Sequence, residues 1–232
     1  MASNYLSFNF MSILYLVATP IGNLKDITLR ALEVLGTVDI ILAEDTRRTS
    51  KLISAYNIEK PLESFHEHNE EQKIPTILTN LKAGKKIALV SDAGTPTLSD
   101  PGFKLVREVI REGLKVESIP GASAILTALT SSGLPTDQFL FVGYLPKKAS
   151  KQKEILDLIN LVLEKRGTTV IFFESPFRVR KTLGTLAQRF PEKTVVVARE
   201  LTKLHEEFIR GKAKEVSAQD FPAKGEFTIL LR

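Results

Sequence analysis

The chain has 232 residues, of which 43% are hydrophobic and 25% charged, and its formal net charge is +5. This composition is typical of a globular protein with one large domain or two of about 100 residues each. Cysteine is absent, which excludes disulfides, thiolate nucleophiles and zinc–sulfur sites and favours a reducing, cytoplasmic setting.

Residues 1–10 precede a second methionine, Met11, and we expect them to form a poorly ordered extension. No basic segment precedes an apolar one there, as a secretory signal would require. The longest apolar runs are much shorter than the roughly 20 residues needed to cross a bilayer. We therefore expect a protein that is neither secreted nor membrane-spanning.

Residues 11–134 predict an α/β domain with a largely parallel sheet. Short β-branched runs alternate here with segments of helical period. The expected strands are 13–18, 39–43, 62–65, 86–90 and 116–119, and the expected helices are 28–35, 47–56, 69–82, 103–111 and 123–131. The sheet is expected to be parallel because parallel neighbours need a crossover connection, which a helix supplies.

Residues 135–232 predict a second α/β domain, after a boundary marked by Gly133 and Pro135. The expected strands are 139–144, 168–173, 194–198, 205–210 and 227–231, and the expected helices are 151–165 and 177–190. The last strands lack long crossovers, so we expect them to be antiparallel.

The two halves differ in charge. Residues 1–134 carry 14 basic and 15 acidic side chains, whereas residues 135–232 carry 18 and 12. A basic half suggests an anionic partner, of which nucleic acid is the commonest, although a mildly basic surface also serves solubility.

Several common active-site motifs are absent. The sequence contains no G-x-G-x-x-G, G-x-x-x-x-G-K-[ST], G-x-S-x-G or H-E-x-x-H, which removes the main support for Rossmann, P-loop, hydrolase and zincin sites. His66 and His68 would place two imidazoles on one face of a strand, a spacing that suits a metal. With no third ligand apparent, we favour a polar strand end and expect no metal site.

Five polar loops rich in Gly, Pro, Asp, Ser and Thr directly follow expected strands. They are residues 19–28, 44–49, 91–102, 120–124 and 174–178. Open α/β sheets bind ligands at the carboxyl ends of their strands, so we expect these loops to share one carboxyl edge. The alternative is that Asp45, Asp100 and Ser175 only begin the helices that follow.

Seven segments stand in an order and spacing that resembles the small-subunit ribosomal RNA methyltransferase I family, within the tetrapyrrole methylase superfamily. They are VATPIGNLKDIT, AEDTRRTSKL, LVSDAGTPTLSDPG, SIPGASA, GYLPKK, FFESPFR and ARELTKLHEE. The resemblance extends over residues 13–231. It implies a homodimeric enzyme with two α/β domains and S-adenosylmethionine bound in a cleft between them. The implied substrate is a cytidine ribose 2′-hydroxyl in the decoding region of 16S ribosomal RNA.

The resemblance also implies which residues border the cofactor. From the first half these are Pro20, Asp92, Gly94, Pro96, Leu98, Asp100, Ser123 and Ala124. From the second half they are Glu174, Ala198, Arg199, Phe227 and Thr228. The superfamily does not use the Rossmann-type loop, so the absence of G-x-G-x-x-G agrees with this assignment.

Methyl transfer to a hydroxyl needs an acceptor for its proton, and a carboxylate or imidazole serves as general base. The candidates are Asp100, Glu174, Glu200 and His205. RNA binding needs cations at the ligand edges of the sheets. The candidates are Arg47, Arg48, Lys147, Lys148, Lys151, Arg178 and Lys203.

Two other functions fit parts of the sequence. A tetrapyrrole methyltransferase would belong to the same superfamily, and a noncatalytic RNA-binding module would also explain the basic second half. Family members often continue beyond the last strand into a helical tail that we expect to help hold RNA, whereas this sequence ends at Arg232.

Overall fold

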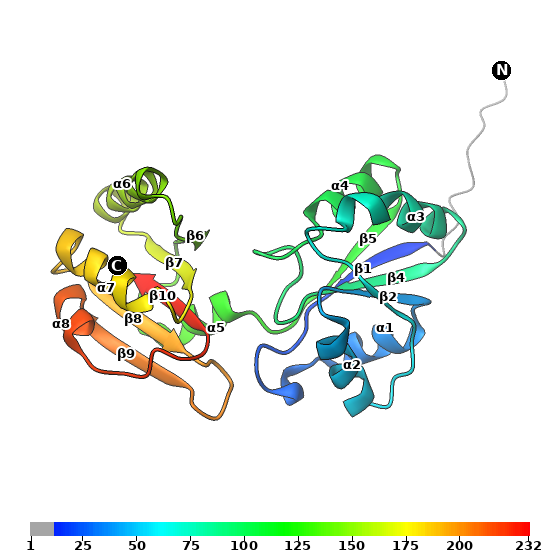
Figure 1. Ribbon diagram of the computed structural model, residues 1–232, viewed down its shortest axis with the longest axis horizontal. Helices are drawn as coiled ribbons and strands as arrows, with labels where there is room; N and C mark the ends of the chain where they lie inside the picture. Colours follow the sequence, from blue (N-terminus) through cyan, green and yellow to red (C-terminus); the bar gives the residue numbers. More distant parts are fainter. Residues whose placement is uncertain (1–11) are drawn as a thin grey trace, which may run out of the picture. The chain divides into compact units, whose positions relative to one another are not determined.

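The computed structural model describes residues 12–232, so the extension expected at residues 1–10 lies outside the described residues. The described part of the chain contains two five-stranded sheets with helices packed against them (Figure 1), which confirms the predicted α/β class. Contacts divide the chain into two units. The first comprises the residues up to Pro20 and Leu24–Ala122, and the second comprises Ile21–Asn23 and Ser123–Arg232.

The first unit is built around a parallel sheet with the strand order β3-β2-β4-β1-β5. Its strands are β1 (Ile13–Val17), β2 (Ile40–Ala43), β3 (Leu62–Ser64), β4 (Lys86–Val90) and β5 (Lys115–Ile119). Its helices are η1 (Leu24–Asp26), α1 (Leu29–Thr37), α2 (Thr46–Ala55), α3 (Glu70–Lys82) and α4 (Phe103–Arg111). The expected parallel sheet is confirmed.

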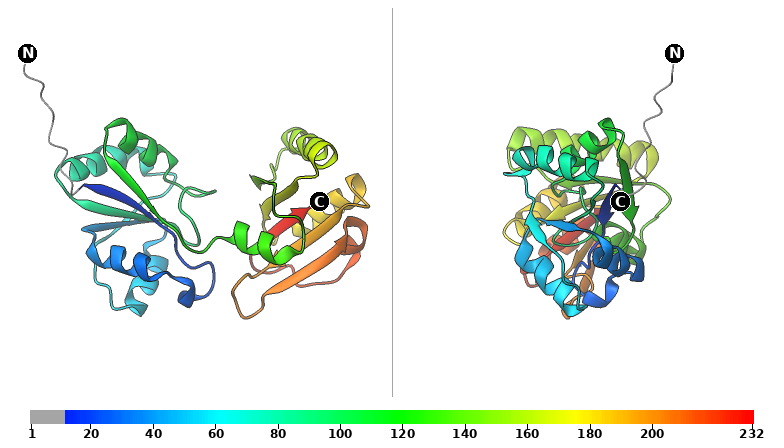
Figure 2. Two further views of the ribbon diagram at one scale, coloured as in Figure 1. Left: turned by 180° about the vertical axis from the view of Figure 1, so that it is seen from behind. Right: turned by 90° about the vertical axis from the view of Figure 1, so that its right-hand side faces the viewer.

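Both faces of this sheet are buried. Successive residues of a strand point to opposite faces, so Leu42 and Leu89 pack with α3 and α4 in one cluster. Ile41 and Ala88 pack with α1 and α2 in another. Figures 1 and 2 show these two pairs of helices on the two faces. Burial on both sides explains why the strands are continuous apolar runs in the sequence.

The second unit is built around a mixed sheet with the strand order β6-β7-β10-β8-β9. Its strands are β6 (Phe139–Tyr144), β7 (Thr169–Glu174), β8 (Thr194–Arg199), β9 (Glu207–Lys212) and β10 (Phe227–Leu231). Its helices are α5 (Ala124–Ser132), α6 (Ala149–Arg166), α7 (Val179–Arg189) and α8 (Ala213–Ala218). β6 and β7 are parallel, whereas β9 and β10 are antiparallel to their neighbours, as predicted.

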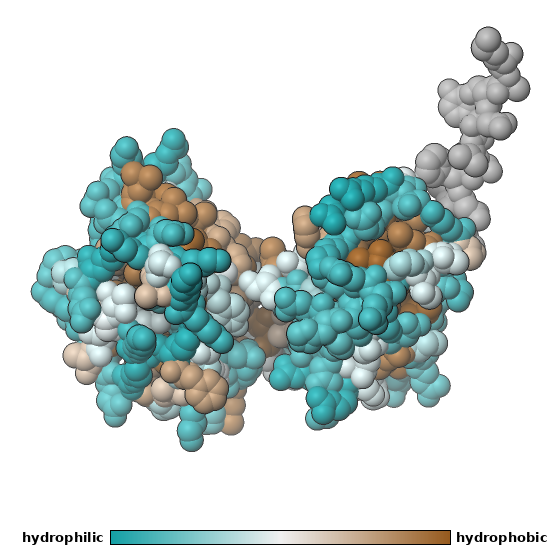
Figure 3. Space-filling model, turned by 45° about the horizontal axis from the view of Figure 1, so that its top comes forward, coloured by the Kyte–Doolittle hydropathy of each residue, from teal (hydrophilic) through white to brown (hydrophobic). Residues whose placement is uncertain are grey.

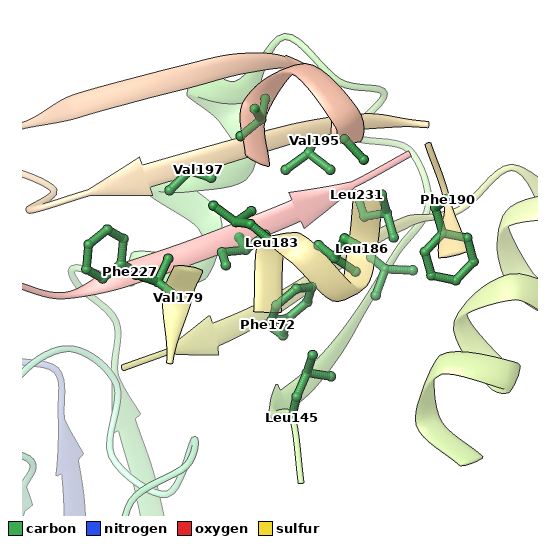
Figure 4. Packing of buried hydrophobic residues seen from close by; sticks show 14 of the residues in the cluster. Leu145, Phe172, Val179, Leu183, Leu186, Phe190, Val195, Val197, Phe227 and Leu231 are labelled. Carbon is green, nitrogen blue, oxygen red and sulfur yellow. The ribbon is translucent and has the colours of Figure 1, made fainter. Parts of the chain in front are cut away.

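The core of the second unit lies between its sheet and the helices α6, α7 and α8. Figure 4 shows Phe172 of β7, Val197 of β8 and Leu231 of β10 facing Leu183 and Leu186 of α7. A short helix such as α8 was not expected from the sequence, because six residues are too few to establish a helical period.

The division between the units falls after Ala122, earlier than the boundary expected after Leu134. The physical reason is that α5 packs against β7, β8 and β10 of the second sheet. Arg210 of β9 also donates a hydrogen bond of 3.0 Å from Nε to the carbonyl oxygen of Ser132, in the last turn of α5. Gly133, with φ of 80°, then ends the helix. The turn residues therefore mark a helix end.

Hydrophilic side chains cover most of the surface visible in Figure 3, and hydrophobic side chains interrupt it on both units. Within residues 12–232, no helix combines the length and apolar character needed to span a membrane.

Candidate functional site

The carboxyl edge of the first sheet carries four of the five predicted loops. They follow β1, β2, β4 and β5, whose carboxyl ends share one edge because the strands are parallel. The fifth loop, at Glu174, follows β7 of the second sheet. The prediction of one common edge is wrong for this loop, because β7 pairs with β6 and β10 and with no strand of the first sheet.

Hydrogen bonds join three of these loops into one framework. Thr19 and Gly94 exchange two backbone hydrogen bonds with N–O distances of 2.9 and 3.0 Å. The Thr19 hydroxyl donates to the carbonyl oxygen of Ser91 at 3.1 Å. The Thr95 hydroxyl donates to the carbonyl oxygen of Ala122, in the loop after β5, at 3.4 Å. The loops after β1, β4 and β5 are therefore positioned together.

The loop after β4 has an unusual backbone. Thr97 and Ser99 have φ of 72° and 66°, a region that costs a residue with a Cβ about 1–3 kcal/mol. Gly102 has φ of 120° and is the N-cap of α4. A Cβ at Gly102 would lie 2.5 Å from Cδ2 of Leu89, so the position requires glycine. The alternative in which Asp100 caps α4 is therefore wrong, because the helix begins beyond Gly102.

Three acidic residues gather at this edge: Glu44 after β2, and Asp92 and Asp100 after β4. The backbone N–H of Asp45 donates to Oδ1 of Asp92 at 2.9 Å. Nη1 of Arg48 lies 3.4 Å from Oδ2 of Asp92. Asp92 thus links the loop after β4 to the start of α2.

Burial raises the pKa of Asp100 to about 6, and the negative charges of Glu44 and Asp92 add to this effect. The nearby Ser91 side chain partly opposes it. Burial, followed by the charge of Asp92, also raises the pKa of Glu44, although Arg48 partly offsets this. The edge therefore holds more negative charge than its own cations neutralise, and Asp100 can exchange a proton near neutral pH.

Asp45 caps α2, as one reading of the sequence predicts. Its Oδ1 accepts a hydrogen bond of 2.9 Å from the backbone N–H of Arg47. The guanidinium of Arg47 also donates to both carboxylate oxygens, at 3.0 and 2.7 Å. The hydrogen bond from the Arg47 side chain, and then that from its backbone, hold the pKa of Asp45 well below its usual value. Arg47 and Arg48, two of the three arginines predicted to bind RNA, thus have carboxylate partners within the first unit, since Arg48 pairs with Asp92.

His66 and His68 lie beyond the end of β3, with ring centroids 6.0 Å apart. Nε2 of His66 lies 3.2 Å from Nδ2 of Asn69, whereas its Nδ1 is buried without a hydrogen-bond partner. In the described part of the chain, no group of three or more His, Cys, Asp or Glu side chains is arranged to hold a metal ion.

Glu174, at the end of β7, is among the most buried acidic residues of the second unit, with 2% of its surface exposed. Nε and Nη2 of Arg178 donate to its two oxygens at 2.7 and 3.0 Å. The Ser175 N–H and the Thr182 hydroxyl donate to the same carboxylate at 2.8 and 2.6 Å. Nη2 of Arg178 also donates to the carbonyl oxygen of Leu145 at 2.7 Å. This network fixes the turn after β7 to the end of β6.

The other cofactor residues predicted from the second half of the sequence lie in two adjacent rows across β7, β10 and β8. Phe227 pairs with Glu174 and with Arg199, and Thr228 pairs with Phe173 and with Ala198. All but Phe173 are buried. Nε of Arg199 donates to Oε2 of Glu207 at 3.1 Å. The structure thus brings this predicted set together at one end of the second sheet.

Glu200 follows β8 with φ of 53° and is held by two donors. Nζ of Lys203 and the N–H of Glu226 donate to its Oε1 at 2.9 and 3.0 Å. Burial would raise the pKa of Glu200, but these hydrogen bonds lower it below the usual value. His205 is exposed in the same β8–β9 connection.

The remaining predicted residues lie in several places. Pro20 and Pro96 are partly or fully buried in the first unit, and Leu98 is exposed between the two strained positions. Ser123 and Ala124 begin α5 in the second unit, and no hydrogen bond from the Ser123 side chain caps the helix. Lys147, Lys148 and Lys151 are exposed after β6.

Two features were missed by sequence reasoning. The role of Glu44 could have been found from its place directly after the buried strand β2. Phe177, 96% exposed between Glu174 and Arg178, has no such signal, because a phenylalanine is more often buried.

Residues 13–217 match the family model described as Tetrapyrrole (Corrin/Porphyrin) Methylases. A Thermotoga maritima protein named ribosomal RNA small subunit methyltransferase I is 47% identical over 223 residues, covering 95% of this chain and 98% of that protein. A Bacillus subtilis protein of the same name is 47% identical and covers 100% of this chain and 80% of that protein. The chain belongs to the ribosomal RNA small subunit methyltransferase I family.

Solved structures place this family member among the tetrapyrrole methyltransferase folds. A cobalt precorrin-4 methyltransferase of cobalamin biosynthesis superposes with a TM-score of 0.70 at 20% identity, covering 96% of this chain and 95% of that one. A uroporphyrin III C-methyltransferase from Thermus thermophilus superposes with a TM-score of 0.62 at 20% identity, covering 94% and 96%. At this identity the likeness shows the fold alone.

Proposed function

We propose that this protein transfers a methyl group from S-adenosylmethionine to the ribose 2′-hydroxyl of a cytidine in the decoding region of 16S ribosomal RNA. Family membership supports the methyl transfer to small-subunit RNA, and the sequence resemblance supports the cytidine 2′-hydroxyl. The observation that carries the proposal is the partly buried group of Glu44, Asp92 and Asp100 at the carboxyl edge of the first sheet.

These residues fit the implied cofactor chemically. S-adenosylmethionine carries a sulfonium and an ammonium cation, and when bound it supplies an electrophilic methyl group. Burial, and then the neighbouring carboxylates, raise the pKa values of Glu44 and Asp100, and Arg48 only partly offsets this at Glu44. A cationic ligand would lower both values and would be bound more tightly as a result. Asp92, Gly94 and Asp100 would hold it, and the remaining predicted cofactor residues would complete its site.

The first task of the chain's own residues is to position the acceptor hydroxyl. Alignment of two reactants as a near-attack pair contributes on the order of 7–11 kcal/mol. The hydrogen-bonded loops after β1, β4 and β5 provide a rigid frame for this, and the strained positions Thr97 and Ser99 agree with a preorganised binding loop.

The second task is to accept the hydroxyl proton, and Asp100 is the best suited of the candidates. Its pKa of about 6 makes it ionised, yet still basic, at neutral pH. Glu174 receives four hydrogen bonds within its own unit, and hydrogen bonding lowers the pKa of Glu200. Both arrangements favour positioning roles for these two residues.

Two classes of cation would bind RNA. The first class forms salt bridges that can be exchanged for contacts with phosphate, and the second class forms no salt bridge within residues 12–232. Lys147, Lys148 and Lys151 belong to the second class, whereas Arg47, Arg48 and Lys203 belong to the first. Arg178 keeps its hydrogen bonds to Glu174 and Leu145 and supports the turn after β7. We propose that the enzyme acts as a cytoplasmic homodimer, as the family resemblance implies.

The test incubates the protein with methyl-labelled S-adenosylmethionine and small ribosomal subunits, followed by alkaline hydrolysis of the RNA. A 2′-O-methyl group prevents attack of that oxygen on the adjacent phosphate, so the label should remain in an alkali-resistant dinucleotide. Asp100→Asn should slow transfer by about 100-fold or more. Asp137→Asn, at an exposed position of the second unit, is the matched control and should transfer at the wild-type rate.

Other outcomes would support the alternatives. Label released in a free nucleotide would contradict the ribose assignment. Methylation of a tetrapyrrole in place of RNA would support the second enzyme class. A protein that binds RNA but shows no heat on calorimetric titration with S-adenosylmethionine would be a noncatalytic RNA-binding module.

A further inference from the structure

Three aromatic rings gather on β6 and β7. The rings of Phe141 and Phe173 have centroids 5.0 Å apart, and those of Tyr144 and Phe173 are 5.7 Å apart. The pairing of β6 with β7 shifts between Phe141 and Tyr144, where Gly143 has φ of 68°. This irregularity places Tyr144 opposite Phe173 and so aligns all three rings. Tyr144 remains 55% exposed on a strand at the edge of its sheet.

A fourth ring, that of Phe177, is 96% exposed in the turn after β7. The turn is held firmly, because Glu174 binds both the Ser175 N–H and the guanidinium of Arg178. Arg178 in turn donates to the carbonyl oxygen of Leu145, just beyond the end of β6. Phe177 is therefore presented to solvent at the same end of the two strands as Tyr144.

Three lysines follow at this end. Lys147 and Lys148 follow Leu145 and Pro146, and Lys151 lies in the first turn of α6. All three are exposed, and no salt bridge within residues 12–232 involves them. Unneutralised cations next to exposed rings are the combination that binds single-stranded nucleic acid.

We propose that Phe177, Tyr144 and these lysines form a binding site for a single-stranded segment of the RNA substrate, with an unstacked base on the ring of Phe177. The neighbouring phosphates then lie against Lys147, Lys148 and Lys151. This inference rests on the proposed function only in taking RNA as the substrate. It adds a base-stacking residue that charge alone does not reveal.

RNA fits this surface better than a second copy of the chain does. A symmetric contact centred here would bring the lysines of both copies together, and like charges in contact are unfavourable. Lysine is also depleted in the buried centres of protein interfaces. Leu204 is also 93% exposed, but its neighbour Lys203 is paired with Glu200 and Glu226. The cation next to Leu204 is therefore already neutralised, unlike the lysines near Phe177.

The experiment measures binding of a fluorescein-labelled single-stranded RNA of about 12 nucleotides to the full chain by fluorescence anisotropy. Phe177→Ala should weaken binding about tenfold, since stacking on an aromatic ring is sequence-tolerant and strong. Phe177→Trp should restore it. Leu204→Ala is the matched control and should bind like the wild type, because it removes an equally exposed side chain outside the site.

Salt dependence separates the two kinds of contact. The double variant Lys147→Gln, Lys148→Gln should reduce the slope of log affinity against log salt by about 1.4, at roughly 0.7 for each phosphate contact. Phe177→Ala should leave that slope unchanged. A role of Phe177 in folding alone would predict neither rescue by tryptophan nor an unchanged slope.

Several results would overturn the site: no RNA binding by the wild type, equal affinity of Phe177→Ala and wild type, or equal losses in Phe177→Ala and Leu204→Ala. A fall in sedimentation mass of Phe177→Ala with unchanged RNA affinity would show a contact between copies instead. Methyl transfer with RNA binding insensitive to Phe177 would overturn this site alone. Phe177-dependent binding without methyl transfer would overturn the proposed function and leave the site.

Discussion

Asp100 and Glu174 are both acidic residues on the carboxyl side of a strand, Glu174 as the last residue of β7 and Asp100 in the loop after β4, but their surroundings differ. Glu174 is the more buried and receives hydrogen bonds from Ser175, Arg178 and Thr182. Burial, and then the negative charge of Glu44, raise the pKa of Asp100 to about 6, and Ser91 only partly offsets them. Burial alone therefore does not create a reactive base. The number and charge of the partners decide whether a buried carboxylate holds structure or moves a proton.

The largest expected effect is on stability at Glu174. Glu174→Ala should lower the free energy of unfolding by about 3–5 kcal/mol, because it leaves the Arg178 guanidinium partly buried without its carboxylate. Urea denaturation followed by circular dichroism measures this loss. Glu71→Ala is the control, since it breaks the exposed pair with Lys104 and should change stability little. If Glu174→Ala and Glu71→Ala lose equal free energy of unfolding, the buried network of Glu174 does not hold the structure. The contrast drawn between Glu174 and Asp100 would then fail.

A second variant tests the loop that carries Asp100. Gly102→Ala should destabilise the protein by about 2 kcal/mol, because φ of 120° is strained for alanine and its Cβ would meet Leu89. Gly36→Ala is the control in α1, where a Cβ has no atom within 4 Å. That variant should be more stable than the wild type by about 0.5–1 kcal/mol. A loop that tolerates Gly102→Ala would not be the rigid frame described above.

A smaller effect of opposite sign is expected at Asp100 in the ligand-free protein. Because its pKa is higher in the folded state, the wild type loses stability as the pH rises from about 4 to about 6. Asp100→Asn removes this loss and should be more stable by about 1 kcal/mol above pH 7. This value is discounted from about 3 kcal/mol for solvent screening.

The pH dependence checks this assignment. The advantage of Asp100→Asn should shrink steadily below about pH 6 and disappear near pH 4, as measured by urea denaturation across that range. If the difference in free energy of unfolding between Asp100→Asn and the wild type does not change with pH, folding does not raise the pKa of Asp100.

Much of the fold could be predicted from the sequence, because its signals are local. Apolar runs such as Ile87–Val90 separated by amphipathic segments predict a parallel sheet, and they placed Asp92 and Gly94 at its carboxyl edge. Strand pairing between distant segments has no such signal. The loop at Glu174 was therefore expected at the same sheet edge as the loop that carries Asp100, although β7 belongs to the second sheet.

The site was harder to predict than the fold. An Asp-Pro pair fits both a helix start and a ligand loop, and only the backbone of Gly102 shows that α4 begins later. The spacing of Glu174 and Arg178 is that of an ion pair on a helix. The sequence does not show whether Arg178 binds Glu174 or RNA, because this depends on how deeply the pair is buried in the folded protein. The exposure of Phe177 is likewise a property of the folded turn.

The pH dependence of single-turnover methyl transfer to small ribosomal subunits tests the central claim most directly. With Asp100 as the proton acceptor, the rate should rise about tenfold per pH unit at low pH and then level off. The midpoint should lie below pH 6, because the bound cationic cofactor lowers the pKa of Asp100 from its value of about 6 in the ligand-free protein. Asp100→Asn should lose both this rise and at least about 100-fold of the rate, whereas Asp137→Asn should keep the wild-type profile. An Asp100→Asn enzyme with the wild-type rate and profile would contradict the assignment of Asp100.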